Sequence, residues 1–256
     1  MNAFGWERRI ERAAELARSY PFASQILDFY SQLASFQRDV YEQLRCRKPA
    51  GSIAEMLPYF PALLSLAGRV GPGGLAESAT ALMQQKSRWM AMLNGYWDPE
   101  EQGVVPIGES EMVLVRAMLQ PFAENLACRE EIRCELAGNT CPFCGELPQV
   151  GVLRPEGEGA KRSLICGLCS TEWQFRRMLC PKCGEETVDK LPVYIAEDFQ
   201  HVRVEACDTC RTYLKSVDLT KDGYAVPVVD ELATVPLNAW AEERGYTKLY
   251  PNLLGM

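Results

Sequence analysis

Four pairs of cysteines, each with the spacing Cys-x-x-Cys, fall within 70 residues in the second half of this 256-residue chain. The pairs are Cys141/Cys144, Cys166/Cys169, Cys180/Cys183 and Cys207/Cys210. A turn of this spacing lets two thiolates reach one metal ion from a single tight loop, and its backbone N–H groups can hydrogen-bond the sulfurs. Eight such thiols suffice for two four-cysteine sites. The pattern therefore constrains the second half to a fold built around metal ions.

The intervals between the pairs predict how the cysteines combine. The chain has 21 residues between Cys144 and Cys166 and 23 between Cys183 and Cys207, enough for a β-hairpin that brings one pair back beside the next. We therefore expect sequential pairing, with an interleaved cross-brace as the alternative. Site 1 would contain Cys141, Cys144, Cys166 and Cys169, and site 2 would contain Cys180, Cys183, Cys207 and Cys210. Zinc and iron both accept four tetrahedral thiolates, so the spacing leaves the ion open and favours zinc.

The first pair of each site has the sequence Cys-Pro-x-Cys-Gly. Pro142 and Pro181 fix φ inside the turn, while Gly145 and Gly184 tolerate a positive φ directly after it. These are features of a metal-binding knuckle. The second pair of each site is followed by Ser170 or Arg211 instead of glycine.

The first half has a helical pattern. Between residues 21 and 45, apolar side chains recur every three or four positions and form one stripe of a helix. The stripe consists of Phe22, Ile26, Phe29, Leu33, Phe36, Val40 and Leu44. A second stripe predicts a helix over about 109–135, bent or split by Pro121, and shorter helices are expected at 6–18, 58–70 and 75–93. Stripes separated by short breakers favour a helical bundle whose apolar faces form its core.

After residue 140 the helical period gives way to short β-prone runs at 163–165, 193–195, 202–204 and 213–217, and 229–244 is helical again. We predict an α+β multidomain protein: an N-terminal α-helical bundle followed by two tandem rubredoxin-like or zinc-ribbon β modules. The expected units are an α-helical domain (1–138), a first four-cysteine ribbon (139–178), a second four-cysteine ribbon (179–222) and a C-terminal helical tail that packs back (223–256).

Composition narrows the function classes. Asp and Glu number 34 against 27 Lys and Arg, and this acidic balance argues against nucleic-acid and lipid partners. The N-terminus lacks a signal-peptide pattern and no apolar run is long enough to cross a bilayer, so we expect a cytoplasmic protein without membrane insertion. A reducing compartment favours metal binding over disulfides for paired cysteines.

Catalytic chemistry is not indicated. Four-thiolate sites keep no open coordination position, and phosphate-binding or nucleophile-elbow motifs are absent from the sequence. We therefore predict no catalytic residues and a protein that is not an enzyme. Cys46, Cys128 and Cys134 are interpreted as buried or incidental thiols of helical segments, and His201, the single histidine, as a packed or surface residue of a β-prone run.

The motifs resemble one known family. The runs CPFCGELPQVG (141–151), RSLICGLCSTEWQFRRMLCPKCG (162–184) and EACDTCRTYLKSV (205–217) are similar to the core of the formate dehydrogenase accessory protein family, FdhE. The resemblance extends beyond cysteines to Thr171-Glu172-Trp173 and to the Thr-Tyr-Leu-Lys run at 212–215. The tail also resembles the family, which usually has Asp where Asn238 stands.

This resemblance implies a helical domain followed by two rubredoxin-like ribbons, each with one mononuclear metal ion, iron in the family and zinc as the alternative. It implies a cytoplasmic factor that binds the catalytic subunit of a molybdenum or tungsten formate dehydrogenase and is needed for its assembly or activation. A homo-oligomer stays open. The alternatives are a rubredoxin-like electron carrier and a nucleic-acid-binding zinc-ribbon protein.

Overall fold

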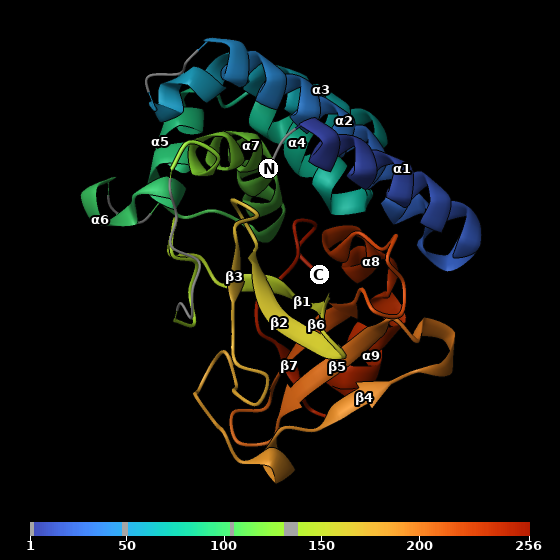
Figure 1. Ribbon diagram of the computed structural model, residues 1–256. Helices are drawn as coiled ribbons and strands as arrows, with labels where there is room; N and C mark the ends of the chain where they lie inside the picture. Colours follow the sequence, from blue (N-terminus) through green and yellow to red (C-terminus); the bar gives the residue numbers. More distant parts are fainter. Residues whose placement is uncertain (1–2, 48–50, 103–104, 131–137) are drawn as a thin grey trace.

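The computed structural model describes residues 3–47, 51–102, 105–130 and 138–256. The first half is helical and the second half is built on one β-sheet, with the helices above the sheet in Figure 1. The helices of the first half are α1 (Ala3–Ser19), η1 (Pro21–Ala23), α2 (Ser24–Arg47), η2 (Ile53–Tyr59), α3 (Phe60–Val70), α4 (Gly73–Met83), α5 (Lys86–Trp97), α6 (Pro99–Gln102) and α7 (Glu109–Ala127). This arrangement confirms the predicted order of a helical region followed by a sheet region.

The helix predictions differ from the structure in three places. The segment expected as one helix over 75–93 forms α4 and α5, which are separated near Gln84 and Gln85. α7 is continuous through Pro121 but ends at Ala127, short of the expected 135; residues 131–137 lie outside the described residues. Phe22, the first member of the predicted stripe, is 57% exposed because it lies in η1 and not in α2.

α7 is the central helix of the first half. Nearly every residue from Val113 to Asn125 is buried, including the polar side chains of Arg116, Gln120 and Glu124. α7 is in contact with α2, α3, α4 and α5, so no side of it is left to solvent over this stretch. The sequence predicted a single apolar stripe for this helix. Because the polar residues of α7 are buried as well, they need hydrogen-bond partners inside the protein.

The second half contains one twisted sheet. Its strands are β1 (Pro148–Glu156), β2 (Gly159–Cys166), β3 (Glu172–Gln174), β4 (Val193–Ile195), β5 (Val202–Cys207), β6 (Thr212–Asp218) and β7 (Thr247–Lys248). The strand order is β3-β2-β1-β6-β5-β4, with β7 also paired to β6. The short helices η3 (Val188–Lys190) and η4 (Glu197–Phe199) flank β4. Each predicted interval between cysteine pairs contains an antiparallel hairpin, β1–β2 in the first and β4–β5 in the second.

The two hairpin modules are joined by a parallel pairing of β1 with β6 at Gly151–Ser216. A Cβ atom on Gly151 would lie 2.1 Å from the Ser216 hydroxyl, so a larger residue needs the Ser216 side chain to shift. Glycine therefore suits this close approach of the two strands. Because of this pairing, the modules form one continuous sheet.

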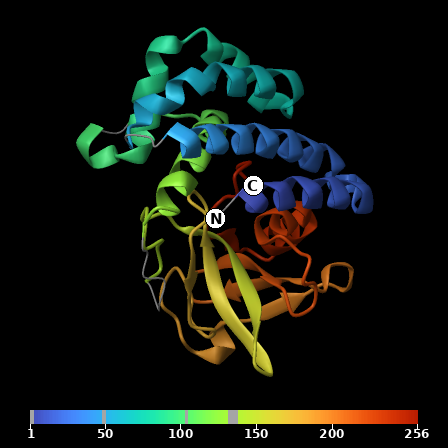
Figure 2. The ribbon, with the colours of Figure 1, turned by 45° about the horizontal axis from the view of Figure 1, so that its top comes forward.

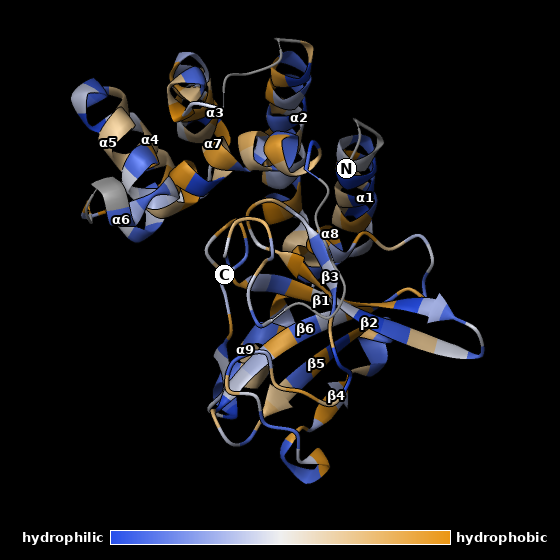
Figure 3. Cartoon of the chain, turned by 60° about the vertical axis from the view of Figure 1, so that its left-hand side comes forward, coloured by the Kyte–Doolittle hydropathy of each residue, from blue (hydrophilic) through white to orange (hydrophobic). Residues whose placement is uncertain are grey.

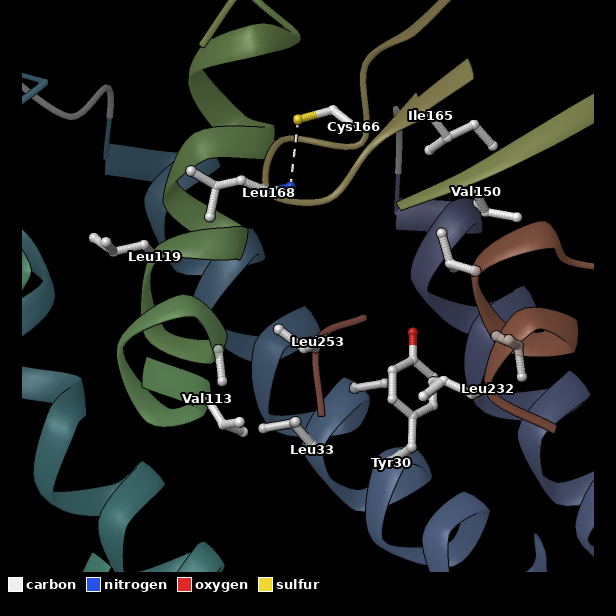
Figure 4. Packing of buried hydrophobic residues seen from close by; sticks show 14 of the residues in the cluster. Tyr30, Leu33, Val113, Leu119, Val150, Ile165, Cys166, Leu168, Leu232 and Leu253 are labelled. Carbon is white, nitrogen blue, oxygen red and sulfur yellow. Dashed lines mark hydrogen bonds between the residues drawn. The ribbon is translucent and has the colours of Figure 1, made fainter. Parts of the chain in front are cut away.

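The first helix of the tail lies between the halves. The tail forms α8 (Pro227–Ala233) and α9 (Val235–Glu243) where the sequence predicted a helix over 229–244. α8 contacts α1 on one side and β1 and β6 on the other, and Figure 2 shows it directly below α1. Figure 4 shows apolar side chains from α2, α7, the sheet and the tail in the same core, among them Leu33, Leu119, Val150 and Leu253. Figure 3 shows hydrophobic and hydrophilic residues interleaved along these elements.

Candidate metal centres

The cysteines of the first module converge at one point. Cys141 and Cys144 lie in the turn before β1, Cys166 is the last residue of β2, and Cys169 lies in the turn that follows. Their sulfurs are 3.5 Å apart for Cys141 and Cys169, 3.4 Å for Cys144 and Cys166, and 3.5 Å for Cys144 and Cys169. The hairpin β1–β2 thus brings the two turns face to face, with the sequential pairing expected from the intervals.

The second module repeats this arrangement around β4 and β5. The Cys180 and Cys210 sulfurs are 3.6 Å apart, and those of Cys183 and Cys207 are 3.7 Å apart. In each module all four sulfurs lie within 4.8 Å of one another. The structure therefore brings together the same two groups of four cysteines that the sequence predicted as sites 1 and 2.

The sulfur spacing fits a metal ion better than a disulfide. A disulfide requires sulfurs about 2.05 Å apart, whereas a tetrahedron with metal–sulfur bonds of about 2.3 Å has edges of about 3.8 Å. The separations of 3.4 to 3.7 Å are close to the tetrahedral edge, and each described cysteine has a free thiol. Each cluster could hold one metal ion with four thiolate ligands. In that tetrahedral geometry no coordination position stays open for another ligand.

Donor groups surround the sulfurs. Backbone N–H groups donate to Cys141 from Phe143 at 3.4 Å and to Cys180 from Lys182 at 3.4 Å. The sulfur of Cys166 accepts from the N–H groups of Leu168 at 3.3 Å and Cys169 at 3.4 Å; the first of these bonds is drawn in Figure 4. Such donors spread the negative charge of metal-bound thiolates.

A threonine hydroxyl lies beside the last sulfur of each cluster. Thr171 Oγ1 is 3.1 Å from Cys169 Sγ, and Thr212 Oγ1 is 2.8 Å from Cys210 Sγ. Since a metal-bound thiolate carries no proton, the hydroxyl would be the donor in a loaded site. In the sequence, both threonines stand out only as parts of the runs that resemble the family. Their position two residues after the last cysteine of each module is the signal that could have assigned them this role.

The turns share one backbone conformation. Gly145 and Gly184 have φ values of 76° and 75°, as expected for glycines after the first turns. Ser170 and Arg211, which follow the second turns, have φ values of 54° and 56°. They are the non-glycine residues with positive φ in the described chain. A side chain in this region costs about 1–2 kcal/mol, so both residues need a compensating role.

Contacts of Ser170 and Arg211 with other parts of the protein supply that role. The hydroxyl of Ser170 donates to Glu124 on α7 at 2.6 Å and accepts from Arg9 on α1 at 3.0 Å. The guanidinium of Arg211 donates to the Arg244 carbonyl after α9 and lies 4.0 Å above the ring of Tyr246. The first cluster is thereby linked to the helices and the second to the tail.

The electrostatics of the clusters favour a cation. Burial raises the pKa of the Cys166 thiol well above its ordinary value. At Cys141, hydrogen bonding to Cys144, then to Cys166 and Cys169, lowers the pKa of the thiol. At Cys210 burial opposes ionisation, but the hydroxyl of Thr212 and neighbouring donors lower the pKa to about 7. Four thiolates cannot be held this close together without a positive ion between them.

The two clusters differ in exposure. Cys141, Cys166 and Cys169 are buried in the first cluster and Cys144 is half-buried. In the second cluster Cys183 is exposed and Cys210 is half-buried. Arg116 of α7 also donates to the carbonyl of Gly167, so the helices cover the first cluster. Solvent therefore reaches the second cluster more readily.

The remaining candidates lie away from both clusters. Cys46 and Cys128 are exposed and not buried, since they lie at the ends of α2 and α7; Tyr41 donates to Cys128 at 3.4 Å. Cys134 lies outside the described residues. His201 Nε2 is 2.9 Å from the buried carboxylate of Asp230, which also binds Arg12. Because the Arg12 guanidinium already binds the carboxylates near His201, we assign no metal ion to this place.

Together, the helical half and the two four-cysteine modules on one sheet define an α+β protein with two rubredoxin-like modules that could each hold a metal ion. The described residues include no helix that is both long and apolar enough to span a bilayer. Two family descriptions match the second half: "FdhE, central domain" over residues 140–177 and "FdhE, C-terminal domain" over 179–254. The chain belongs to the FdhE family.

Relatives and one solved structure agree with this assignment. The "Protein FdhE homolog" of Aquifex aeolicus is 28% identical over 100% of this chain and 98% of its own length. The homologue of Pseudomonas aeruginosa is 33% identical over 77% of this chain and 66% of its own. The crystal structure of the FdhE protein from Pseudomonas aeruginosa has the same fold, with a TM-score of 0.70 at 24% identity over 99% of this chain and 96% of that chain.

Proposed function

We propose that this protein is a formate dehydrogenase accessory protein. In this proposal it binds the catalytic subunit of a molybdenum or tungsten formate dehydrogenase in the cytoplasm and is needed for the assembly or activation of that enzyme. The observation that carries the proposal is the match of both cysteine modules to FdhE domains, on a chain related over its full length to an FdhE homologue.

The arrangement of the clusters supports binding over catalysis. Each cluster offers four thiolates to one ion and keeps no ligand position for a substrate. The metal ions would instead hold the turns in place, since the short hairpins have little apolar core of their own. The protein would thus act without a catalytic step of its own, by presenting a surface to the enzyme.

The metal ligands in this proposal are the eight clustered cysteines. Cys141, Cys144, Cys166 and Cys169 would bind one ion, and Cys180, Cys183, Cys207 and Cys210 would bind the other. Iron is the ion implied by the family resemblance and zinc is the alternative. When bound, the ion supplies charge compensation and a rigid tetrahedral centre.

Deletion of the gene tests the proposed function. Formate-dependent dye reduction should fall strongly in the deletion strain while the transcript of the catalytic subunit stays at its normal level. Expression of the chain from a plasmid should restore activity, and a Cys46→Ser variant should restore it equally because Cys46 lies outside both clusters. Normal formate oxidation in the deletion strain of an organism that possesses the enzyme would refute the proposal.

A rubredoxin-like electron carrier is the second candidate, and the exposure of Cys183 favours it, because an exposed ligand shortens the path to a redox partner. Iron in the second cluster would then undergo reversible one-electron reduction. Voltammetry of the iron-loaded protein separates the candidates. A carrier gives a reversible redox couple, also when the protein is purified from cells that lack formate dehydrogenase. An accessory protein needs no redox turnover.

A further inference from the structure

The outer edge of the second module combines an unpaired strand with apolar side chains. β4 is the last strand of the sheet, and its outer edge pairs with no strand in the part of the chain that the structure describes. Val193 and Ile195 are 47% and 63% exposed, and Met178 in the preceding loop is 38% exposed. Figure 3 shows β4 as an apolar strand at the border of the sheet. Exposed apolar residues on an unpaired edge are a template for another strand.

Charged residues lie on the same face as these apolar side chains. In the register of the sheet, Val193 is opposite Glu205 and Ile195 is opposite Arg203 on β5. Directly opposed residues project to one face of a sheet, so the exposed side chains of β4 lie beside this Arg–Glu pair. We call the surface formed by Arg177, Met178, Val193, Ile195 and Arg203 the β4 surface.

A cavity of about 110 Å³ opens on the β4 surface, next to the second metal cluster. Arg162, Arg177, Arg203 and Glu205 line it together with apolar residues. The carboxylate of Glu205 accepts from Arg162 at 2.6 Å and from Arg203 at 2.7 Å. Three arginines and a single glutamate thus line the cavity, in a protein whose overall charge is −7.

One arginine in this cavity is left for a ligand, because the terminal guanidinium nitrogens of Arg162 already donate to Arg176, Leu179 and Glu205. Arg177 is exposed, and no ion pair or hydrogen bond joins it to another described residue. A carboxylate is the group that satisfies guanidinium donors best.

We propose that the β4 surface binds an extended peptide segment of a client protein that adds a strand to β4 and places a carboxylate in the arginine-lined cavity. The backbone of the segment would pair with the free edge of β4, and its apolar side chains would cover Val193 and Ile195. The acidic side chain would bind the exposed guanidinium of Arg177. The identity of the client, the catalytic subunit, rests on the proposed function. The binding mode rests on the free edge of the sheet.

The position of the cavity explains why metal loading and client binding would be linked. Cys180 and Cys207 also line it, so the second metal cluster forms one wall. Loss of that ion would release the loop from 176 to 183 that carries Arg177 and Met178. Client binding would then need the second cluster filled.

Hydrogen exchange on the full metal-loaded chain tests the binding mode. With the purified catalytic subunit present, the amides of residues 193–195 should exchange at least about tenfold more slowly. A C-terminally amidated eight-residue peptide of alternating Val and Thr that ends in Asp should protect the same amides, and the same amidated peptide ending in Asn should bind several-fold more weakly. Protection elsewhere with the subunit bound would overturn the docking site and leave the proposed function standing.

Substitutions test the residues. Arg177→Glu and Ile195→Asp should each weaken binding of the catalytic subunit by about tenfold or more, with unchanged metal content and far-UV circular dichroism. Arg8→Glu is the matched control, because Arg8 is an exposed arginine of α1. Equal affinity of all three variants would overturn the proposal, as would protection of 193–195 by a second copy of this chain. If only the acidic peptide binds, the site holds and the proposed client is wrong; if neither binds, both fail.

Discussion

The hydroxyl of Ser170 donates a hydrogen bond of 2.6 Å to Oε1 of Glu124, although the two residues are separated by 46 positions in the sequence. Glu124 is buried in α7 and Ser170 ends the second turn of the first metal cluster. The same Glu124 oxygen accepts from Arg9 at 2.8 Å. This contact connects α1, α7 and the first cluster, and it keeps a serine where the backbone favours glycine.

Substitution of Ser170 should separate backbone strain from hydrogen bonding. Ser170→Ala keeps the strained φ and removes the hydroxyl, so we expect a loss of about 1–3 kcal/mol in the free energy of unfolding. Ser170→Gly also removes the hydroxyl but relieves the strain, so it should be more stable than the alanine variant by about 1 kcal/mol. Urea unfolding of metal-loaded protein measures both. An alanine variant as stable as the parent protein would contradict this account.

The buried ion pair between Arg9 and Glu124 predicts a strong effect of charge removal. Both side chains are at most 2% exposed, so Glu124→Gln removes a buried carboxylate that pairs with the Arg9 guanidinium and should cost about 3–5 kcal/mol. The double variant Arg9→Met, Glu124→Leu should lose much less than the sum of the single variants. A double-mutant cycle checks this, and additive losses would show that the pair is not coupled.

A second buried group predicts a pH dependence. Burial opposes ionisation of Glu231, but Lys215 and Lys248 outweigh it and lower the pKa of Glu231 to about 2. Because the pKa is lower in the folded state than the ordinary 4.5, this carboxylate stabilises the protein fully above pH 4.5 and loses its contribution between pH 4.5 and 2. The stability difference between the parent protein and Glu231→Gln should therefore shrink across that window. A stability difference that stays constant from pH 4.5 to 2 would show that ionisation of Glu231 does not contribute to stability.

The exposure of the clusters predicts the order of metal release. A chelator should remove one equivalent quickly from the second cluster, where Cys183 is exposed, and the other slowly from the first. Cys207→Ser should abolish the fast phase and Cys166→Ser the slow phase, because each removes one ligand. A coloured chelator follows both phases. Two equivalents released at one rate would show that burial does not control access.

Part of this structure could be predicted from the sequence because it is encoded locally. The cysteine pairs, the glycines after the first turns and the hairpin-length intervals indicate the two clusters without any tertiary information. The polar residues of α7 could not be assigned in this way. Arg116 donates to the carbonyl of Asn252 at 2.9 Å, a partner 136 positions away, and no local pattern reveals such a contact. Ser170 and Arg211 were likewise visible only as departures from glycine, since their compensating partners lie in α7 and after α9.

The most direct test of the central claim is the affinity of the metal-loaded chain for the catalytic subunit of formate dehydrogenase. Titration calorimetry with the purified subunit should show saturable binding at a fixed stoichiometry. The double variant Cys180→Ser, Cys183→Ser should lose binding by about tenfold or more, while Cys46→Ser should bind like the parent protein. Absence of binding by the loaded parent protein, or equal binding by the double variant, would contradict a metal-dependent accessory role.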